Sequence, residues 1–305
     1  MAFTINLHRL SPIFLLIVAS SLYSSAAAGD PPDPIYRTHA SEVRLTFSVT
    51  DQNQHGVATL QASDFAVVDK EIIVRNFQSF TRPGATKLEI AMLVDASGSM
   101  LPRFRRETSD VLDLLAQTAG VPEENISVFS FAESHPKLLC AADCRSSHAA
   151  EQIPLPRIGD LTPLYDTILD ATDYLAQHAD QDAEKVLIII SDGQDTVSRN
   201  SLRDATDAAI NAGVEIYALD FNSNNSNPGS AVLYRLACAT GGRYFWGMNS
   251  TDRATNAILE DFNATYVITY KLPSHDSGFH ALRILPTHNS TLQFRSRSGY
   301  YFDHR

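Results

Sequence analysis

Hydrophobic and polar residues follow different periods in successive parts of the chain. Between residues 41 and 80, apolar residues alternate with polar ones, as at Leu45, Phe47 and Val49, and polar turns separate the short apolar runs. A period of two is typical of half-buried β-strands. The segment 41–86 is therefore expected to form a few antiparallel strands.

The pattern changes after the turn-like segment at residues 81–87. Apolar runs suited to strands that are buried on both faces then alternate with stretches of helical period. Strands are expected at 88–94, 126–132, 185–192, 214–221 and 243–247, and helices at 102–117, 164–175, 201–213, 230–242 and 251–264. This alternation predicts an α/β fold, a doubly wound and mostly parallel sheet with helices on both faces.

The last part of the chain returns to strand periodicity. Apolar residues alternate from Tyr266 to Leu272, and further strand-like runs follow. Two or three strands bury too little surface to fold alone. We therefore expect 264–305 to pair with 41–86 in one small β-sandwich, and the α/β domain at 87–263 to be inserted between its strands.

The first 28 residues have the pattern of a signal peptide. Arg9 precedes a short apolar core at 13–19, and alanines end the segment at Ala28. A membrane anchor is the alternative, but this core is far shorter than the roughly 20 residues of a spanning helix. We expect cleavage after Ala28, a secreted or periplasmic mature chain without a membrane span, and an extended, proline-rich lead-in at 29–40.

The overall charge disfavours one class of partner. The 305 residues include 35 acidic and 24 basic side chains, which gives a formal net charge of −11 with histidine neutral. Nucleic-acid binding requires a basic surface that neutralises phosphates. Nucleic acid is therefore not an expected partner.

Three cysteines occur, at positions 140, 144 and 238. In an exported protein disulfides are permitted, and Cys140 and Cys144 are close enough in sequence for a local bridge. Cys238 is expected to be free in a buried helix end, and a long-range pair between it and one of the others is the alternative.

Five oxygen-bearing side chains are expected at one edge of the predicted sheet. Two of the most apolar strands lead into Asp95 and Asp192, and Thr162 lies between them, just before a helix. Ser97 and Ser99 follow the first aspartate in a turn that can point both hydroxyls at one ion. Sites in doubly wound sheets lie beyond the carboxyl ends of the strands. Hard oxygen ligands suit Mg²⁺, Mn²⁺ or Ca²⁺ rather than zinc, so a divalent-metal site is predicted.

Each of these residues also has a local explanation. Ser97 or Ser99 can cap the helix that follows. Thr162 can cap the next helix, and Asp192 can belong to an ordinary turn. Local capping does not account for the occurrence of all five residues in predicted loops at one edge of one sheet, so the metal site is the favoured interpretation.

The sequence Asp95-Ala-Ser97-Gly-Ser99, with Thr162 and Asp192 in this order, resembles the metal-ion-dependent adhesion site of the von Willebrand factor type A (VWA) domain. The resemblance implies a Rossmann-like VWA fold over about 87–263. It also implies that the three hydroxyls ligate the metal directly and that the two aspartates act through waters or hydroxyls. Neutral ligands leave the ion electrophilic, so the expected function is adhesion-type capture of an exposed Asp or Glu of a partner protein.

The flanking segments are similar to those of secreted bacterial VWA-related proteins of the kind abundant in Acidobacteria. In such proteins a stretch with characteristic Asp, Gly, Leu and Phe positions precedes the VWA domain. Here these positions are filled by Asp51, Gly56, Leu60, Asp64 and Phe65. The ending "RSGYY" at 297–301 also matches. Lys70 and Glu71 stand where a turn glycine is common, so the turn after Asp69 is expected to differ. This similarity implies architecture rather than activity.

Two other classes of function compete with partner capture. A metal-dependent hydrolase needs a general base within reach of the reacting group, and no histidine lies beside the motif. Ser97 and Ser99 also lack the nucleophile-elbow pattern. No catalytic residue is therefore expected. A structural subunit whose metal site is merely stabilising, or empty, is the other alternative.

Overall fold

The computed structural model describes residues 42–100, 105, 108–109, 112–113, 121–132, 136–141, 144, 161–222, 226–246 and 251–303. The expected signal peptide and lead-in lie outside these residues, and so does most of the helix expected at 102–117. Within the described ranges, no helix is long and apolar enough to cross a membrane.

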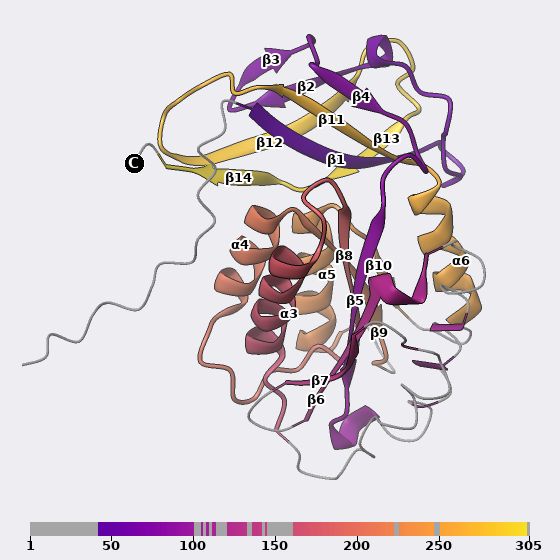
Figure 1. Cartoon of the computed structure of the whole chain (residues 1–305), viewed down its shortest axis with the longest axis vertical. Coiled ribbons are helices and arrows are strands. Elements are labelled where there is room, and N and C mark those ends of the chain that lie inside the picture. The colour runs from indigo at the N-terminus through magenta and orange to yellow at the C-terminus, as the bar shows by residue number, and fades with distance from the viewer. Residues whose placement is uncertain are drawn as a thin grey trace, which may run out of the picture. The chain divides into compact units, whose positions relative to one another are not determined.

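A six-stranded sheet forms the centre of the α/β domain, in the order β10-β9-β8-β5-β6-β7 (Figure 1). Its strands are β5 (Leu88–Asp95), β6 (Ile126–Phe131), β7 (Lys137–Ala141), β8 (Glu184–Ser191), β9 (Val214–Asp220) and β10 (Tyr244–Trp246). Neighbouring strands are parallel except β6 and β7, which are antiparallel. The predicted doubly wound, mostly parallel sheet is confirmed, with β7 as an additional edge strand.

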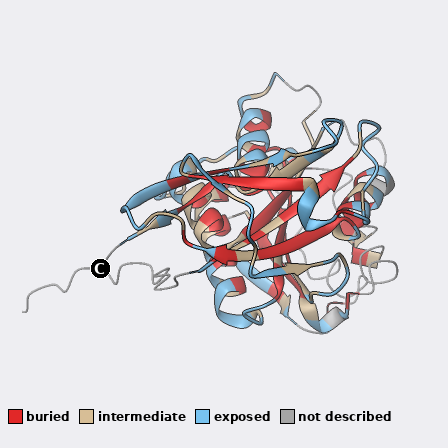
Figure 2. Cartoon of the chain, turned by 90° about the horizontal axis from the view of Figure 1, so that it is seen from above, coloured by how far each residue is buried: buried red, intermediate tan, exposed pale blue. Residues whose placement is uncertain are grey.

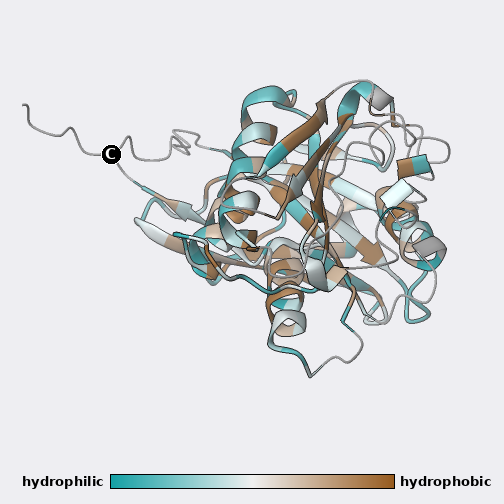
Figure 3. Ribbon diagram, turned by 90° about the horizontal axis from the view of Figure 1, so that it is seen from below, coloured by the Kyte–Doolittle hydropathy of each residue, from teal (hydrophilic) through white to brown (hydrophobic). Residues whose placement is uncertain are grey.

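Helices cover both faces of this sheet, as Figure 1 shows. The first face is covered by α3 (Leu164–His178), α4 (Leu202–Ala212) and α5 (Pro228–Thr240), and the second face by α6 (Thr251–Phe262). Alternate residues of β5 point to the two layers. Ala91 and Leu93 share a core with α3 to α5, whereas Met92 shares a core with α6. Burial on both faces explains the uninterrupted apolar runs, and the sheet strands are largely hydrophobic (Figure 3).

Strands from both ends of the chain are interleaved in two four-stranded sheets, β13-β1-β11-β4 and β14-β12-β2-β3. The N-terminal strands are β1 (Glu42–Thr50), β2 (Phe65–Asp69), β3 (Ile72–Val74) and β4 (Ser79–Thr81). The C-terminal strands are β11 (Thr265–Lys271), β12 (Gly278–Pro286), β13 (Gln293–Ser296) and β14 (Gly299–Phe302). In the β1–β11 pair, Phe47 lies opposite Tyr266. The chain ends therefore build one sandwich, with the α/β domain inserted between them.

Aromatic side chains fill the interior of this sandwich. The ring of Phe47 lies 5.0 Å from that of Phe65 and 5.6 Å from that of Tyr266, measured between centroids. Viewed from above, the long sandwich strands are buried over most of their length (Figure 2). At the β2–β3 hairpin, Lys70 and Glu71 have φ angles of 47° and 66°, so two non-glycine residues adopt the left-handed conformation of this turn.

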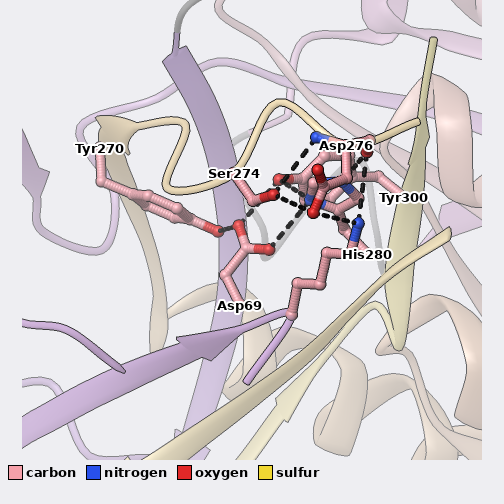
Figure 4. A network of polar contacts seen from close by, with 7 residues as sticks. Asp69, Tyr270, Ser274, Asp276, His280 and Tyr300 are labelled. Carbon is pink, nitrogen blue, oxygen red and sulfur yellow. Dashed lines mark hydrogen bonds and ion pairs between the residues drawn. The ribbon is translucent and has the colours of Figure 1, made fainter. Parts of the chain in front are cut away.

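A buried polar network around Asp69 joins strands from the two ends of the chain (Figure 4). The Asp69 Oδ2 atom accepts hydrogen bonds from the Tyr270 hydroxyl at 2.9 Å and the Tyr300 hydroxyl at 2.8 Å. His280 Nδ1 lies 3.3 Å from Asp69 Oδ1, and His280 Nε2 lies 2.8 Å from the Asp276 carbonyl oxygen. One carboxylate of β2 thus anchors β11, β12 and β14.

The cysteines follow the expected pairing. Cys140, in β7, forms a disulfide with Cys144, and their Cα atoms are 5.6 Å apart. Cys238 is free, but it is exposed. The expectation that it is buried was wrong, because Leu236 and Ala237 take the inward positions of α5 at this turn.

Candidate metal site at the carboxyl edge of the central sheet

Asp95 is the last residue of β5 and is completely buried. Its Oδ1 atom accepts a hydrogen bond from the Ser97 backbone N–H at 2.9 Å, and its Oδ2 atom accepts one from the Ser191 hydroxyl at 2.6 Å. Both carboxylate oxygens are therefore engaged by the chain. Asp95 fixes the turn that follows it, which suits a carboxylate that supports the ligands of an ion rather than one that binds directly.

Ser97 and Ser99 present neighbouring hydroxyls. Their Oγ atoms are 3.1 Å apart, because a single 3₁₀ turn at Gly98–Met100 brings alternate side chains to the same side. The turn is closed by a hydrogen bond of 3.1 Å from the Met100 N–H to the Ser97 carbonyl. Ser97 is buried, whereas Ser99 is exposed. One hydroxyl of the pair therefore lies in the interior and the other at the surface.

Thr162 is held against the loop that carries Asp192. Its backbone N–H donates to Thr196 Oγ1 at 2.7 Å, and its carbonyl accepts from the Thr196 N–H at 2.9 Å. Among the described residues, its own hydroxyl makes no hydrogen bond. The explanation of Thr162 as a helix cap is wrong, because α3 has Pro163 at its N-cap. The Tyr165 N–H instead donates to Asp195 Oδ2 at 3.1 Å, so the cap comes from the same distant loop.

Asp192 follows β8 and is buried. Its Oδ1 atom accepts a hydrogen bond from the Gln194 N–H at 3.0 Å, so the local turn predicted as an alternative is also present. Gly193 has a φ of 74°, and a Cβ atom there would lie 2.2 Å from the carbonyl oxygen of Gly229. Glycine is thus required where this loop passes the first turn of α5.

Ser191 connects the two halves of the site. Its hydroxyl donates to Asp95 and accepts from the Gly193 N–H at 2.9 Å. It therefore joins the ends of β5 and β8, and the loop that carries Asp192. Neither Ser191, the last residue of β8, nor Thr196, in the loop that follows, was predicted from the sequence. No hydrogen bond between described residues joins Thr162 to the two serines.

The family model of the von Willebrand factor type A domain matches residues 89–263. The chain belongs to the VWA family. VWA domains are generally protein-interaction modules rather than catalysts, and they often bind a divalent metal. No curated protein sequence matches this chain significantly.

Several solved structures are similar to this VWA protein. The proximal thread matrix protein 1 of the mussel byssus has 15% identity and a TM-score of 0.45, and the match covers 64% of this chain and 51% of that one. BatB from Bacteroides thetaiotaomicron has 17% identity and a TM-score of 0.41, over 57% and 96% of the two chains. A von Willebrand factor type A protein from Catenulispora acidiphila has 12% identity and a TM-score of 0.43, over 89% and 76%. This chain spans about half the length of the mussel protein.

The electrostatics of the VWA site follow from the burial of its acids. Burial raises the pKa of Asp95 to about 6, although hydrogen bonds from Ser191 and Ser97 oppose the shift. The negative charge of Asp192 raises this pKa further. Two buried acids that repel one another form a pair that a cation would stabilise.

The candidate donor set of this VWA domain contains hydroxyls as well as carboxylates. Among the described residues, no group of three His, Cys, Asp or Glu side chains is placed to hold a metal ion. The candidate set instead combines two carboxylates with the hydroxyls of Ser97, Ser99 and Thr162. All five donors are hard oxygens, so they fit Mg²⁺, Mn²⁺ or Ca²⁺ and do not fit a zinc site built from thiolate and imidazole.

Proposed function

We propose that this VWA protein is an exported, divalent-metal-dependent binding module of the adhesion type, which captures an exposed Asp or Glu side chain of a partner protein. The observation that carries the proposal is the pair of Ser97 and Ser99 hydroxyls, 3.1 Å apart, beside a carboxylate that the chain already engages through both oxygens. The two hydroxyls bond to each other and keep lone pairs that can act as neutral ligands.

The five residues divide into two roles. The hydroxyls of Ser97, Ser99 and Thr162 would ligate the ion directly, and Asp95 and Asp192 would support them through hydroxyls or waters. When bound, Mg²⁺ supplies an open coordination position for a carboxylate oxygen. Mn²⁺ and Ca²⁺ prefer the same class of donor.

The exposure of the residues gives the direction of approach. Asp95, Ser97, Thr162 and Asp192 are buried, whereas Ser99 is exposed. The negative charges of the protein thus lie behind the hydroxyls, and an incoming carboxylate reaches the site from the side of Ser99. This arrangement keeps the partner's carboxylate from meeting the carboxylates of Asp95 and Asp192 directly at the surface.

Export is part of the proposal. The first 28 residues have the charge and apolar pattern of a signal peptide. The Cys140–Cys144 disulfide also suits an oxidising compartment such as the periplasm or the medium. A metal-dependent adhesion module would meet both its ion and its partner there.

A structural role for the ion is the second candidate function. Four of the five residues are buried, and the five come from three segments that are far apart in the sequence. An ion held among them would fasten these loops together without any partner. In that case the ion would raise the melting temperature of the chain but support no binding.

The test is capture of partners on the immobilised mature chain, from periplasm or medium, in Mg²⁺ and in EDTA. Thr162→Val removes one hydroxyl and keeps the side-chain shape, and Thr206→Val, on α4, is the matched control. We expect capture that requires Mg²⁺ or Mn²⁺, is lost in Thr162→Val, is retained in Thr206→Val, and disappears when partner carboxylates are converted to amides. Capture that is unchanged in EDTA contradicts the proposal, and metal stabilisation without capture favours the structural role.

A further inference from the structure

A cavity lies at the edge of the central sheet opposite the candidate metal site. It has a volume of about 360 Å³ and is lined by the amino ends of β8 and β9, the end of α4, and sandwich residues of β1, β11 and β14. The candidate metal site follows the carboxyl ends of β5 and β8, so the two sites are at different ends of the strands. Small-molecule sites have volumes from about 300 Å³ upward. The cavity is thus large enough for a small ligand.

Lys185, one of three basic side chains that line this cavity, has no partner for its charge. Across the described ranges, its ammonium makes neither a hydrogen bond nor an ion pair. Burial, followed by the charges of Arg44 and Arg297, lowers the pKa of Lys185, and the charge of Asp182 only partly opposes this shift. An uncompensated charge in a partly buried position is costly, unless an anion enters beside it.

Arg297 is held rigidly by neutral groups. Its guanidinium donates to the Ile210 carbonyl at 3.0 Å and to the Arg44 carbonyl at 2.8 Å, and it lies 5.5 Å from the centre of the Tyr300 ring. Its Nε atom is buried without a hydrogen bond. Among the described residues, no carboxylate forms an ion pair with this guanidinium, and the more distant charge of Asp69 only partly opposes the lowering of its pKa by burial.

The acidic residues nearby neutralise little of this charge. Arg44 lies 3.5 Å from Asp182, but that carboxylate is 97% exposed, and such a surface pair is weak. Glu42 lines the exposed rim and accepts a hydrogen bond from Gln78. Burial raises the pKa of Glu215 well above its usual range, so this carboxyl favours its neutral form. Three basic and two acidic side chains line the cavity, so its wall carries a net positive charge.

We propose that the cavity binds a small organic anion, whose acid group lies between Lys185 and the two arginines and whose apolar body packs against Tyr300 and Leu272. The lining belongs to both the VWA domain and the sandwich. A bound anion therefore bridges the two parts and stabilises them against separation. This inference does not depend on the proposed metal site.

Calorimetric titration of the full mature chain in EDTA tests the proposal, because EDTA removes any ion to which a carboxylate would bind at the other edge. The probes are 4-phenylbutyrate, its neutral amide, and inorganic phosphate. 4-Phenylbutyrate combines the acid group and the apolar body of the expected ligand. We expect saturable binding of 4-phenylbutyrate, with both other probes roughly tenfold weaker or more, since a hydrogen bond to a charged group has about that effect. Equal binding of the acid and the amide overturns the proposal, and so does no binding of any probe.

Three variants locate the binding. Lys185→Met removes the unpaired charge and keeps the length of the side chain, and Lys137→Met, on the exposed edge strand β7, is the matched control. Thr46→Trp fills the cavity from β1 without changing its charge. We expect 4-phenylbutyrate affinity to fall roughly tenfold in Lys185→Met, to disappear in Thr46→Trp and to stay unchanged in Lys137→Met. Urea unfolding confirms that each variant is folded. Affinity that survives Lys185→Met in a folded chain excludes an anion site here.

Discussion

Asp261, near the end of α6 in the VWA domain, holds the guanidinium of Arg295, in β13 of the sandwich, at 2.6 Å. The same Oδ1 atom accepts a hydrogen bond from Arg243 at 2.7 Å, and the carboxylate is buried. Helix α6 leads directly into β11, which pairs with β1. The last VWA helix is therefore joined to the sandwich by the chain itself and by a buried ion pair.

Replacement of this carboxylate should destabilise the whole chain. Asp261→Ala leaves two arginines without their partner, and loss of one member of a buried pair costs about 3–5 kcal/mol. The control is Asp207→Ala, which removes an exposed pair with Arg203 on α4 and should cost well under about 1 kcal/mol. The free energy of unfolding in urea measures both. Equal, small losses would show that the Asp261 pair does not hold the two parts together.

The metal site should require the close approach of Gly193 and Gly229. A Cβ atom at Gly229 would lie 2.1 Å from the Asp192 carbonyl oxygen, which is backbone and cannot turn away. Gly229→Ala should therefore cost about 1–3 kcal/mol of stability by overpacking and also weaken Mn²⁺ binding. Gly84→Ala is the control, because that position has a φ of 74° and open space around it. Gly84→Ala should lose some stability but keep the Mn²⁺ affinity of the native chain. Equal losses of Mn²⁺ affinity in Gly84→Ala and Gly229→Ala would contradict the assignment of the metal site.

The stability of the chain should depend on the titration of Glu184, a buried residue at the start of β8. Burial raises the pKa of Glu184 to about 7, against the hydrogen bond from Thr86 and the charge of Arg44. Its pKa in the unfolded chain is about 4.3, so the folded state binds this proton more tightly. The stabilising contribution is complete below about pH 4 and is lost as the pH rises to about 7, by up to about 3 kcal/mol.

Glu184→Gln tests this pH dependence, because the amide resembles the protonated carboxyl at every pH. Unfolding in urea at about pH 5 and about pH 8 should show a smaller fall in stability for the variant than for the native chain. The charge of Glu184 also raises the pKa of Glu215, so the difference between the two slopes includes the effect of Glu184 on that neighbour. Identical slopes would mean that Glu184 has an ordinary pKa in the folded chain.

The strands that were predicted best are those with the most complete burial. β5 and β8 lie in the middle of the sheet, and every position from Ile90 to Asp95 is buried, so their apolar runs are unmistakable. The edge strand β7 was missed, because Lys137 and Leu138 are exposed and the segment has no clear period. An edge position requires only one face and one neighbour, and so leaves a weaker signal in the sequence.

The residues of the candidate site were likewise predicted only in part. The motif residues stand out because serines and aspartates directly follow apolar strands. The positioning roles of Ser191 and Thr196 arise from hydrogen bonds to Asp95 and Thr162, which are 96 and 34 residues away in the sequence. Likewise, the cap of α3 comes from Asp195 rather than from the adjacent threonine. Such contacts depend on the packing of loops that no local pattern describes.

The most direct test of the metal site is calorimetric titration of the EDTA-treated, desalted chain with Mn²⁺, repeated with an excess of Mg²⁺. The native chain and Thr206→Val should each show a single binding event that Mg²⁺ competes away. Thr162→Val and Asp192→Asn should bind roughly tenfold more weakly or not at all, because each removes an oxygen donor or a supporting charge. A native chain that binds no Mn²⁺, or a Thr162→Val variant that binds it as tightly as the native chain, would contradict the account.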